Sequence, residues 1–127
     1  MAQLTQVLAE FGEDIGLPAL APGPGGSLQL RLASGALLGV STQGDEVVLH
    51  HAEPVPYDLA ALVLKAMQRA ARSECAADPV QVGVRTTAQG QWLVVGTRLP
   101  LERFSAREMH RLAGHLQAWI AQARGMA

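Results

Sequence analysis

The sequence is poor in cysteine, in aromatic residues and in long apolar runs. Its 127 residues include one cysteine, Cys75, and aromatic residues make up 4%. A single cysteine cannot form an internal disulfide, so we expect a fold that is independent of oxidation and a cytoplasmic location. No apolar run reaches the roughly 18 residues of a membrane-spanning helix. Residues 1–5 also lack the basic and apolar character of a secretory signal.

Recognisable catalytic and metal-binding motifs are also missing. His50 and His51 are neighbours on an expected strand and point to opposite faces, so they cannot bind one metal ion together. His110 and His115 are five residues apart on an expected helix, which is not the spacing of a ligand pair. We therefore expect the histidines at the surface or rim. We expect no enzyme, metal ion or cofactor.

The composition is that of a globular protein, with 49% apolar and 17% charged residues. The length fits one domain over residues 1–127. The net charge is only −1, but residues 1–60 hold seven acidic residues against one basic, and residues 61–127 hold nine basic against four acidic. The near-neutral total argues against general nucleic-acid binding. The uneven distribution fits either a charged protein partner or two solvated faces of opposite sign.

Apolar periodicity predicts an α+β fold with the order α-βββ-α-ββ-α. A helix is expected over residues 2–15, followed by Gly16 and Pro18 as stop signals. Short turns between the apolar stretches at 28–32, 37–42 and 46–53 predict an antiparallel meander. A helix over 58–73, capped by Asp58, precedes two further strands at 80–85 and 92–99. Ser105 and Glu108 form a capping box that begins the last helix.

The expected helix at 58–73 carries more apolar surface than one sheet face can cover. At 100° per residue its apolar side chains span an arc of about 200°. Either the helix lies deep in the core, or it contacts a second subunit, and we favour the second subunit. Its polar side holds Lys65, Arg69 and Arg72, which we interpret as a solvated face. We interpret the acidic group Glu10, Glu13 and Asp14 on the first helix in the same way.

Several short segments follow one another along almost the whole chain in a characteristic order. They are residues 11–18 (FGEDIGLP), 28–30 (LQL), 34–38 (SGALL), 54–56 (PVP) before an Ala/Leu-rich helix, 82–84 (VGV), 91–95 (QWLVV) and 99–102 (LPLE). Their order and spacing resemble the class I chaperones of bacterial type III secretion, the Tir-chaperone or CesT-like family. Within that family the likeness is greatest to the SycN-type branch.

This resemblance implies a dimeric chaperone that binds the N-terminal region of a secreted effector or gatekeeper protein in extended form. It implies a dimer surface on the second helix and the strand after it, either with a second copy or with another small chaperone. The implied dimer residues are Leu59, Leu62, Val63, Ala66, Met67, Ala70, Val82 and Val84. The implied substrate-protein residues are Leu4, Val7, Leu8, Phe11, Leu28, Leu30 and Leu32.

The charge of the chain differs from that of the family, and a second interpretation of its function stays open. Chaperones of this family are commonly strongly acidic, whereas the acidity of this chain is confined to its first half. The rival interpretation is a small-molecule-binding or regulatory α+β domain, which would need a closed apolar pocket with a few convergent polar groups.

Overall fold

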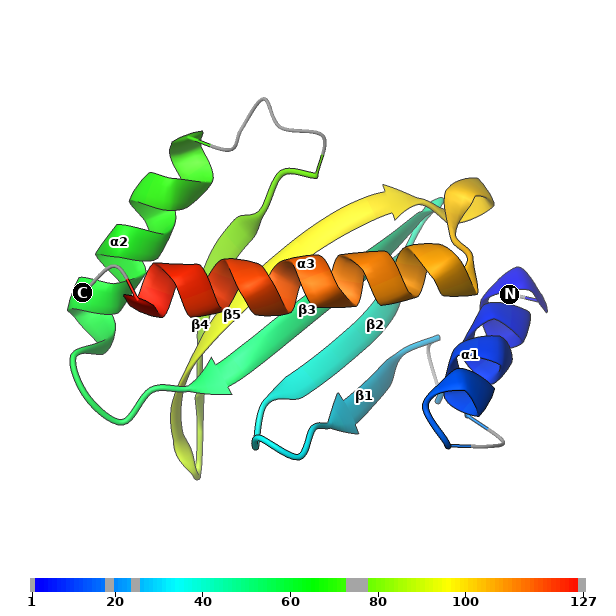
Figure 1. The fold of residues 1–127 in the computed structure, drawn as a ribbon, viewed down its shortest axis with the longest axis horizontal. Helices are drawn as coiled ribbons and strands as arrows, with labels where there is room; N and C mark the ends of the chain where they lie inside the picture. The colour runs from blue at the N-terminus through cyan, green and yellow to red at the C-terminus, as the bar shows by residue number, and fades with distance from the viewer. Residues whose placement is uncertain (1, 18–19, 24–25, 73–77, 126–127) are drawn as a thin grey trace.

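The described part of the chain forms one antiparallel sheet with three α-helices packed against it (Figure 1). The computed structural model describes residues 2–17, 20–23, 26–72 and 78–125. The stop signal at Pro18 and the lone cysteine Cys75 lie outside these residues. The elements are α1 (Ala2–Asp14), β1 (Leu28–Arg31), β2 (Leu37–Gln43), β3 (Glu46–Pro54), α2 (Leu59–Arg72), β4 (Gln81–Thr87), β5 (Gly90–Pro100), a 3-10 turn (Leu101–Arg103) and α3 (Ala106–Gly125). The predicted α+β class and element order are confirmed.

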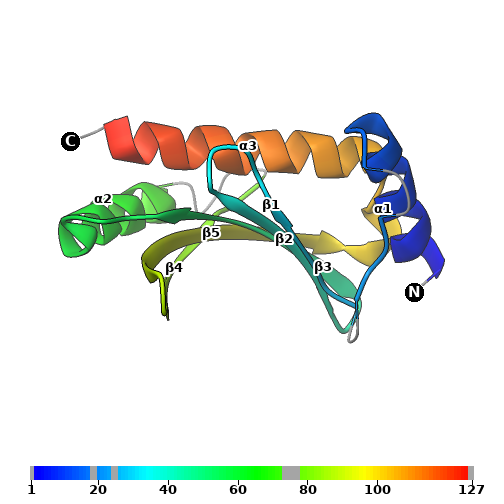
Figure 2. The same cartoon turned by 90° about the horizontal axis from the view of Figure 1, so that it is seen from below.

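The strands lie in the order β1-β2-β3-β5-β4, and every neighbouring pair is antiparallel. The hairpin β4–β5 joins the sheet through β5, which pairs with β3 over nine register positions, from Glu46–Pro100 to Pro54–Trp92. As a result, β1 and β4 are the two edge strands. The helices lie on one side of this twisted sheet, with α3 across its middle and α1 and α2 towards its two ends (Figure 2).

The core lies between the sheet and α3. Alternate residues of the central strands point towards the helix, and Val40, Leu49 and Leu93 are almost fully buried there. Leu112, Leu116 and Ile120 of α3 supply the other side, each with at most 2% of its surface exposed. The core is mainly aliphatic, with Phe11, Phe104 and Trp119 as its aromatic members. In the described part of the chain, no helix is long and apolar enough to cross a membrane.

The helix ends show which local signals act as predicted. The Glu108 N–H donates to Ser105 Oγ at 3.1 Å, so the predicted N-cap of α3 is confirmed. The Glu108 carboxylate, however, pairs with Arg111 instead of turning back to complete a capping box. Gly16 has φ of 81°, and the Leu17 N–H donates to the Gly12 carbonyl at 2.7 Å, which is the expected glycine-terminated end of α1.

Candidate partner-binding surfaces

Helix α2 is attached to the sheet at the outer strand β4 and to α3. Asp58 lies just before it with φ of 55°, and its carbonyl accepts a hydrogen bond from the Leu62 N–H at 3.1 Å. Of the described residues of the helix, only Ala66 is fully buried. The interpretation that this helix lies deep in the core is therefore wrong.

The apolar arc of α2 divides into an inner and an outer part. Leu59, Leu62, Val63 and Ala70 are partly buried and pack against the core. Leu64 points outward with 59% of its surface exposed, and Met67 with 49%. Since the helix covers the sheet with its inner part alone, the outer part is available to a partner.

An apolar hollow of about 630 Å³ is lined by residues of α2 and of strands β4 and β5. We call this region, including the exposed Leu64, Met67 and Val84, the α2–β4 surface. Val84 belongs to edge strand β4 and is 48% exposed. The lining residues are Asp58, Leu59, Ala60, Val63, Leu64, Met67, Val84 and Gln91.

The eight predicted dimer residues are thus brought to one end of the molecule, but in different environments. Met67 and Val84 are exposed, whereas Leu59, Leu62, Val63, Ala70 and Val82 are half-buried. Ala66 has no exposed surface, so it supports the surface from beneath. Their role in dimerisation stays a prediction.

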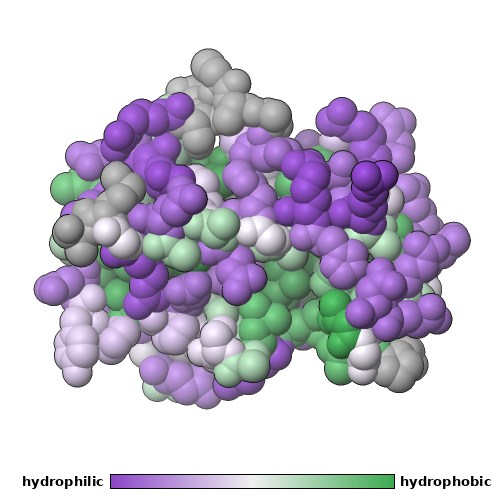
Figure 3. Space-filling view, in the orientation of Figure 1, coloured by the Kyte–Doolittle hydropathy of each residue, from purple (hydrophilic) through white to green (hydrophobic). Residues whose placement is uncertain are grey.

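A second apolar region is formed by residues that follow α1 and by residues in and just after β1. Figure 3 shows hydrophobic side chains gathered below α3 on the side of the molecule that carries α1 and β1. Leu28, Leu30 and Leu32 are partly buried against the core, and Ile15 and Leu17 at the end of α1 are 42% and 45% exposed. We call these five residues the α1–β1 surface.

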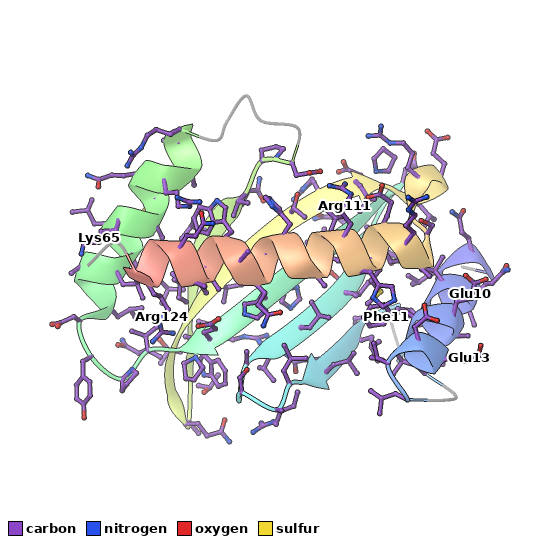
Figure 4. The ribbon with its side chains drawn as sticks, in the orientation of Figure 1. Glu10, Phe11, Glu13, Lys65, Arg111 and Arg124 are labelled. Atoms are coloured by element: carbon purple, nitrogen blue, oxygen red, sulfur yellow. The ribbon has the colours of Figure 1, made fainter. Side chains whose placement is uncertain are left out.

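The apolar stripe of α1 itself is not part of the accessible surface. Leu4, Val7, Leu8 and Phe11 are all buried, each with at most 6% exposed. In Figure 4 Phe11 points from α1 towards α3. These four side chains hold α1 in place, and any role for them in binding a protein substrate stays a prediction.

The acidic residues of α1 behave as predicted from their spacing. Glu10 and Glu13 point away from the body of the protein (Figure 4) and are exposed. Asp14 is also exposed, and its carboxylate lies 3.1 Å from Nε2 of His110 on α3. This end of the molecule therefore presents carboxylates around the apolar α1–β1 surface.

The sequence interpretation missed a polar cluster that joins β3 to α3. His51 is 1% exposed on the helix-covered face of the sheet, which corrects its prediction as a surface or rim residue. Its Nε2 lies 2.9 Å from Glu53, and Glu53 also accepts a hydrogen bond from Arg124 of α3 at 2.8 Å. Alternation predicted that His50 and His51 face opposite ways, but it could not tell which face the helices would cover.

Arg69 is likewise more than a solvated side chain. Its guanidinium lies over the Trp119 ring at 5.4 Å from the ring centre and donates to Gln122. It therefore links α2 to α3. Lys65, by contrast, points away from the body of the protein (Figure 4). Among the residues that the structure describes, no group of three or more His, Cys, Asp or Glu side chains could hold a metal ion.

An ion-pair cluster fixes the start of β4 to α3. Arg111 of α3 (Figure 4) donates to Asp78 at 2.7 Å and to Glu108 at 2.9 Å. The hydrogen bond from Arg111 lowers the pKa of Asp78 below its usual range. Both carboxylates are bound by the one guanidinium, so we assign these groups a structural role.

Neither a protein-family model nor a curated protein matches the sequence. Solved structures do match the fold. A chain of the ExsC–ExsE complex is 11% identical, with a TM-score of 0.71 over 94% of this chain and 89% of that chain. A chain of the HopA1–SchA chaperone–effector complex is 17% identical, with a TM-score of 0.68 over 98% and 97%.

A chain from the complex of the Yersinia pestis type III secretion chaperone SycH with a fragment of YscM2 is 12% identical, with a TM-score of 0.60 over 98% of this chain and 99% of that chain. The architecture is not confined to such complexes, because YbjN of E. coli, a candidate transcription regulator, matches at 13% identity with a TM-score of 0.55 over 93% and 86%. The chain has the fold found in type III secretion chaperone complexes.

Proposed function

We propose that this chain is a type III secretion chaperone that acts in the bacterial cytoplasm, without a cofactor and without catalysis. It binds the N-terminal region of a secreted effector or gatekeeper in extended form and keeps that protein soluble and ready for secretion. The observation that carries the proposal is the whole-chain likeness of its fold to chaperone complexes with protein partners. The resemblance of its sequence segments to the SycN-type branch supports the same assignment.

The α2–β4 surface is the proposed dimer interface. Leu64, Met67 and Val84 are large apolar side chains about half exposed at one end of the molecule. Exposed apolar side chains grouped around an apolar hollow are typical of a protein-binding surface. Both a second copy of this chain and another small chaperone fit such a surface.

The α1–β1 surface is the proposed binding site for the secreted protein. Strand β1 is an edge of the sheet, so its outer backbone groups can pair with an added strand. Leu28 and Leu30 offer partly exposed apolar contacts beside that edge, and Ile15 and Leu17 extend them. An extended segment with alternating apolar side chains would satisfy both the backbone and the apolar groups.

The proposal is tested by deleting the coding sequence in the native bacterium and comparing the proteins secreted under inducing conditions. We expect one or a few proteins to disappear from the medium, and expression of the wild-type chain to restore them. A chain with Leu30→Asp should fail to restore secretion, whereas Gln29→Asp, at the adjacent exposed position on β1, should restore it. An unchanged set of secreted proteins would contradict the proposal, and a ligand-dependent change in transcription would favour a regulatory domain.

A further inference from the structure

Among the described residues, all three helices lie on one face of the sheet, and the second face carries no helix (Figure 2). We call it the helix-free face. Because side chains alternate along a strand, the residues that face away from α3 are those next to the buried ones in sequence. On β3 and β5 these include Val48, His50, Val94 and Gly96, all of which are half-buried.

Gly83 and Gly96 line a hollow on this face, and Gly39 lies beneath the ring of a third lining residue, His50. Gly39 and Gly96 are the register partners of His50 on either side, and Gly83 of β4 pairs with Val94. A methyl group on Gly39 would overlap the His50 imidazole, so that ring lies across Gly39. A methyl group on Gly83 would meet nothing within 4 Å, so the space above Gly83 is open.

The hollow has a volume of about 470 Å³ and lies over β3, β5 and β4. Val48 and Val94 contribute apolar side chains to it. Its volume falls within the roughly 300–1,000 Å³ of ligand sites. It is therefore large enough to receive side chains from another molecule.

The charge of the hollow is of one sign. His50 and Arg85 are the ionisable groups among the described residues that line it. Burial and then the nearby Arg85 guanidinium lower the pKa of His50, so the imidazole is uncharged at neutral pH and Arg85 supplies the positive charge. The Glu46 carboxylate on the same face is paired with Arg98 at 3.2 Å.

Strand β4 connects this hollow to the α2–β4 surface. Val84 lines both hollows, and β4 is an edge strand with no neighbour on its outer side among the described residues. A polypeptide that contacts the outer side of β4 can therefore reach both regions. This continuity favours a protein segment over a free small carboxylate as the occupant.

We propose that the helix-free face binds a segment of another protein that carries an aspartate or glutamate beside aliphatic side chains. The aliphatic side chains lie over Gly83 and Gly96 against Val48 and Val94. The carboxylate accepts hydrogen bonds from the Arg85 guanidinium and from an N–H of the His50 imidazole. This inference does not depend on the proposed secretion role, because a partner of a regulatory domain could carry the same segment.

The test uses a labelled eight-residue peptide of alternating Val and Glu, with a Val and Gln peptide as the uncharged match. Binding is followed by fluorescence anisotropy at low ionic strength, and its location by the backbone amide resonances of Gly39, Gly83 and Gly96. We expect the acidic peptide alone to bind and to shift these three glycines. Free glutamate at the same concentration should leave them unchanged.

Variants separate the proposed contacts. Arg85→Gln should weaken binding about tenfold, because it removes a charge-assisted hydrogen bond. Arg107→Gln, an exposed arginine on α3, is the matched control and should change binding less than twofold. Gly83→Val should block the hollow while the spectrum elsewhere shows that the fold is kept.

The pH dependence of peptide binding is an independent test. A bound carboxylate stabilises the imidazolium, so binding should tighten as the pH falls towards the ordinary histidine value of 6.5, and His50→Gln should remove that dependence. Among the described residues, the ionisable groups that this face presents besides His50 are Arg31, Arg85, Arg98 and Glu46. Any of four results would overturn the proposal. The two peptides could bind equally, or Arg85→Gln could bind as tightly as wild type. The resonance shifts could be confined to α2 or β1, or no resonance could shift at millimolar peptide.

Discussion

Substitution of Met67 by aspartate tests whether α2 binds a partner or is an ordinary surface helix. Met67 lies on the outer part of α2 with 49% of its surface exposed. In an isolated chain the new carboxylate can stay hydrated, so the fold should tolerate it. In a complex formed through the α2–β4 surface the same carboxylate would be buried without a partner.

The size of the effect follows from the exposed surface. Full burial of a methionine side chain stabilises by about 1.5–3 kcal/mol, so covering the exposed half of Met67 contributes about 1 kcal/mol per copy. The variant loses this contribution and adds the cost of an uncompensated carboxylate, which brings the loss to at least ~2 kcal/mol per copy. A dimer of two identical chains should therefore dissociate about a thousandfold more readily, and a mixed dimer about thirtyfold.

The assay is sedimentation velocity over a concentration series, with thermal unfolding as the check on the fold. Ala61→Asp is the matched control, since Ala61 is an exposed residue of the same helix outside the α2–β4 surface. Wild type and Ala61→Asp should assemble, and Met67→Asp should be monomeric with an unfolding midpoint near that of wild type. Assembly of Met67→Asp at the wild-type concentration would refute the assignment of this surface.

Three further predictions concern the stability of the fold. Gly12→Ala should destabilise by about 1–3 kcal/mol in urea titrations, because a methyl group there would lie 2.5 Å from the Leu17 carbonyl oxygen and 2.8 Å from Leu20 Cβ. Gly114→Ala, in open space on α3, should instead stabilise by about 0.5–1 kcal/mol, and a loss equal to that of Gly12→Ala would contradict the steric argument. Ser105→Ala should cost about 1 kcal/mol through loss of the cap to the Glu108 N–H, with Ser105→Asp close to wild type in the same titration. The pKa of His50 is lowered in the folded state, by burial and then by Arg85, so the unfolded chain binds a proton more readily, and the stability of the fold should fall as the pH drops below 6.5. His50→Gln should reduce that loss of stability in thermal unfolding scans from pH 8 to pH 5.5. If the variant shows the same dependence of stability on pH as wild type, other groups cause it.

Local signals predicted the elements well because they act over a few residues. The turn at Gly44, the glycine end of α1 at Gly16 and the Ser105 cap all occur where the sequence placed them. Alternation along residues 46–53 also separated His50 from His51 correctly. These patterns do not tell which face of the sheet is covered. That depends on the packing of α3, which begins more than fifty residues after His51 in the chain.

In the candidate sites too, local patterns identified apolar surfaces but not which side chains the tertiary packing buries. The family resemblance assigned the apolar stripe of α1 to a protein substrate, but Leu4 and Leu8 have no exposed surface, and α1 packs against α3. The wide arc of α2 correctly indicated surplus apolar surface, yet it ranked Leu62 with Met67. The structure separates them, because Leu62 packs against the core and Met67 does not. The hollow over Gly83 and Gly96 also needs the pairing of β5 with β3, which brings Val48 and His50 to it, and no local pattern specifies that pairing.

The central claim is that this chain binds the N-terminal region of a secreted protein. The most direct measurement is native mass spectrometry of the affinity-tagged chain purified from the bacterium under secretion-inducing conditions, followed by amide exchange of the identified partner in the complex. We predict a complex that contains two chaperone chains and one secreted protein, with exchange protection confined to the N-terminal region of that protein. A chain recovered alone as a monomer, or bound only to a small molecule, would contradict the claim.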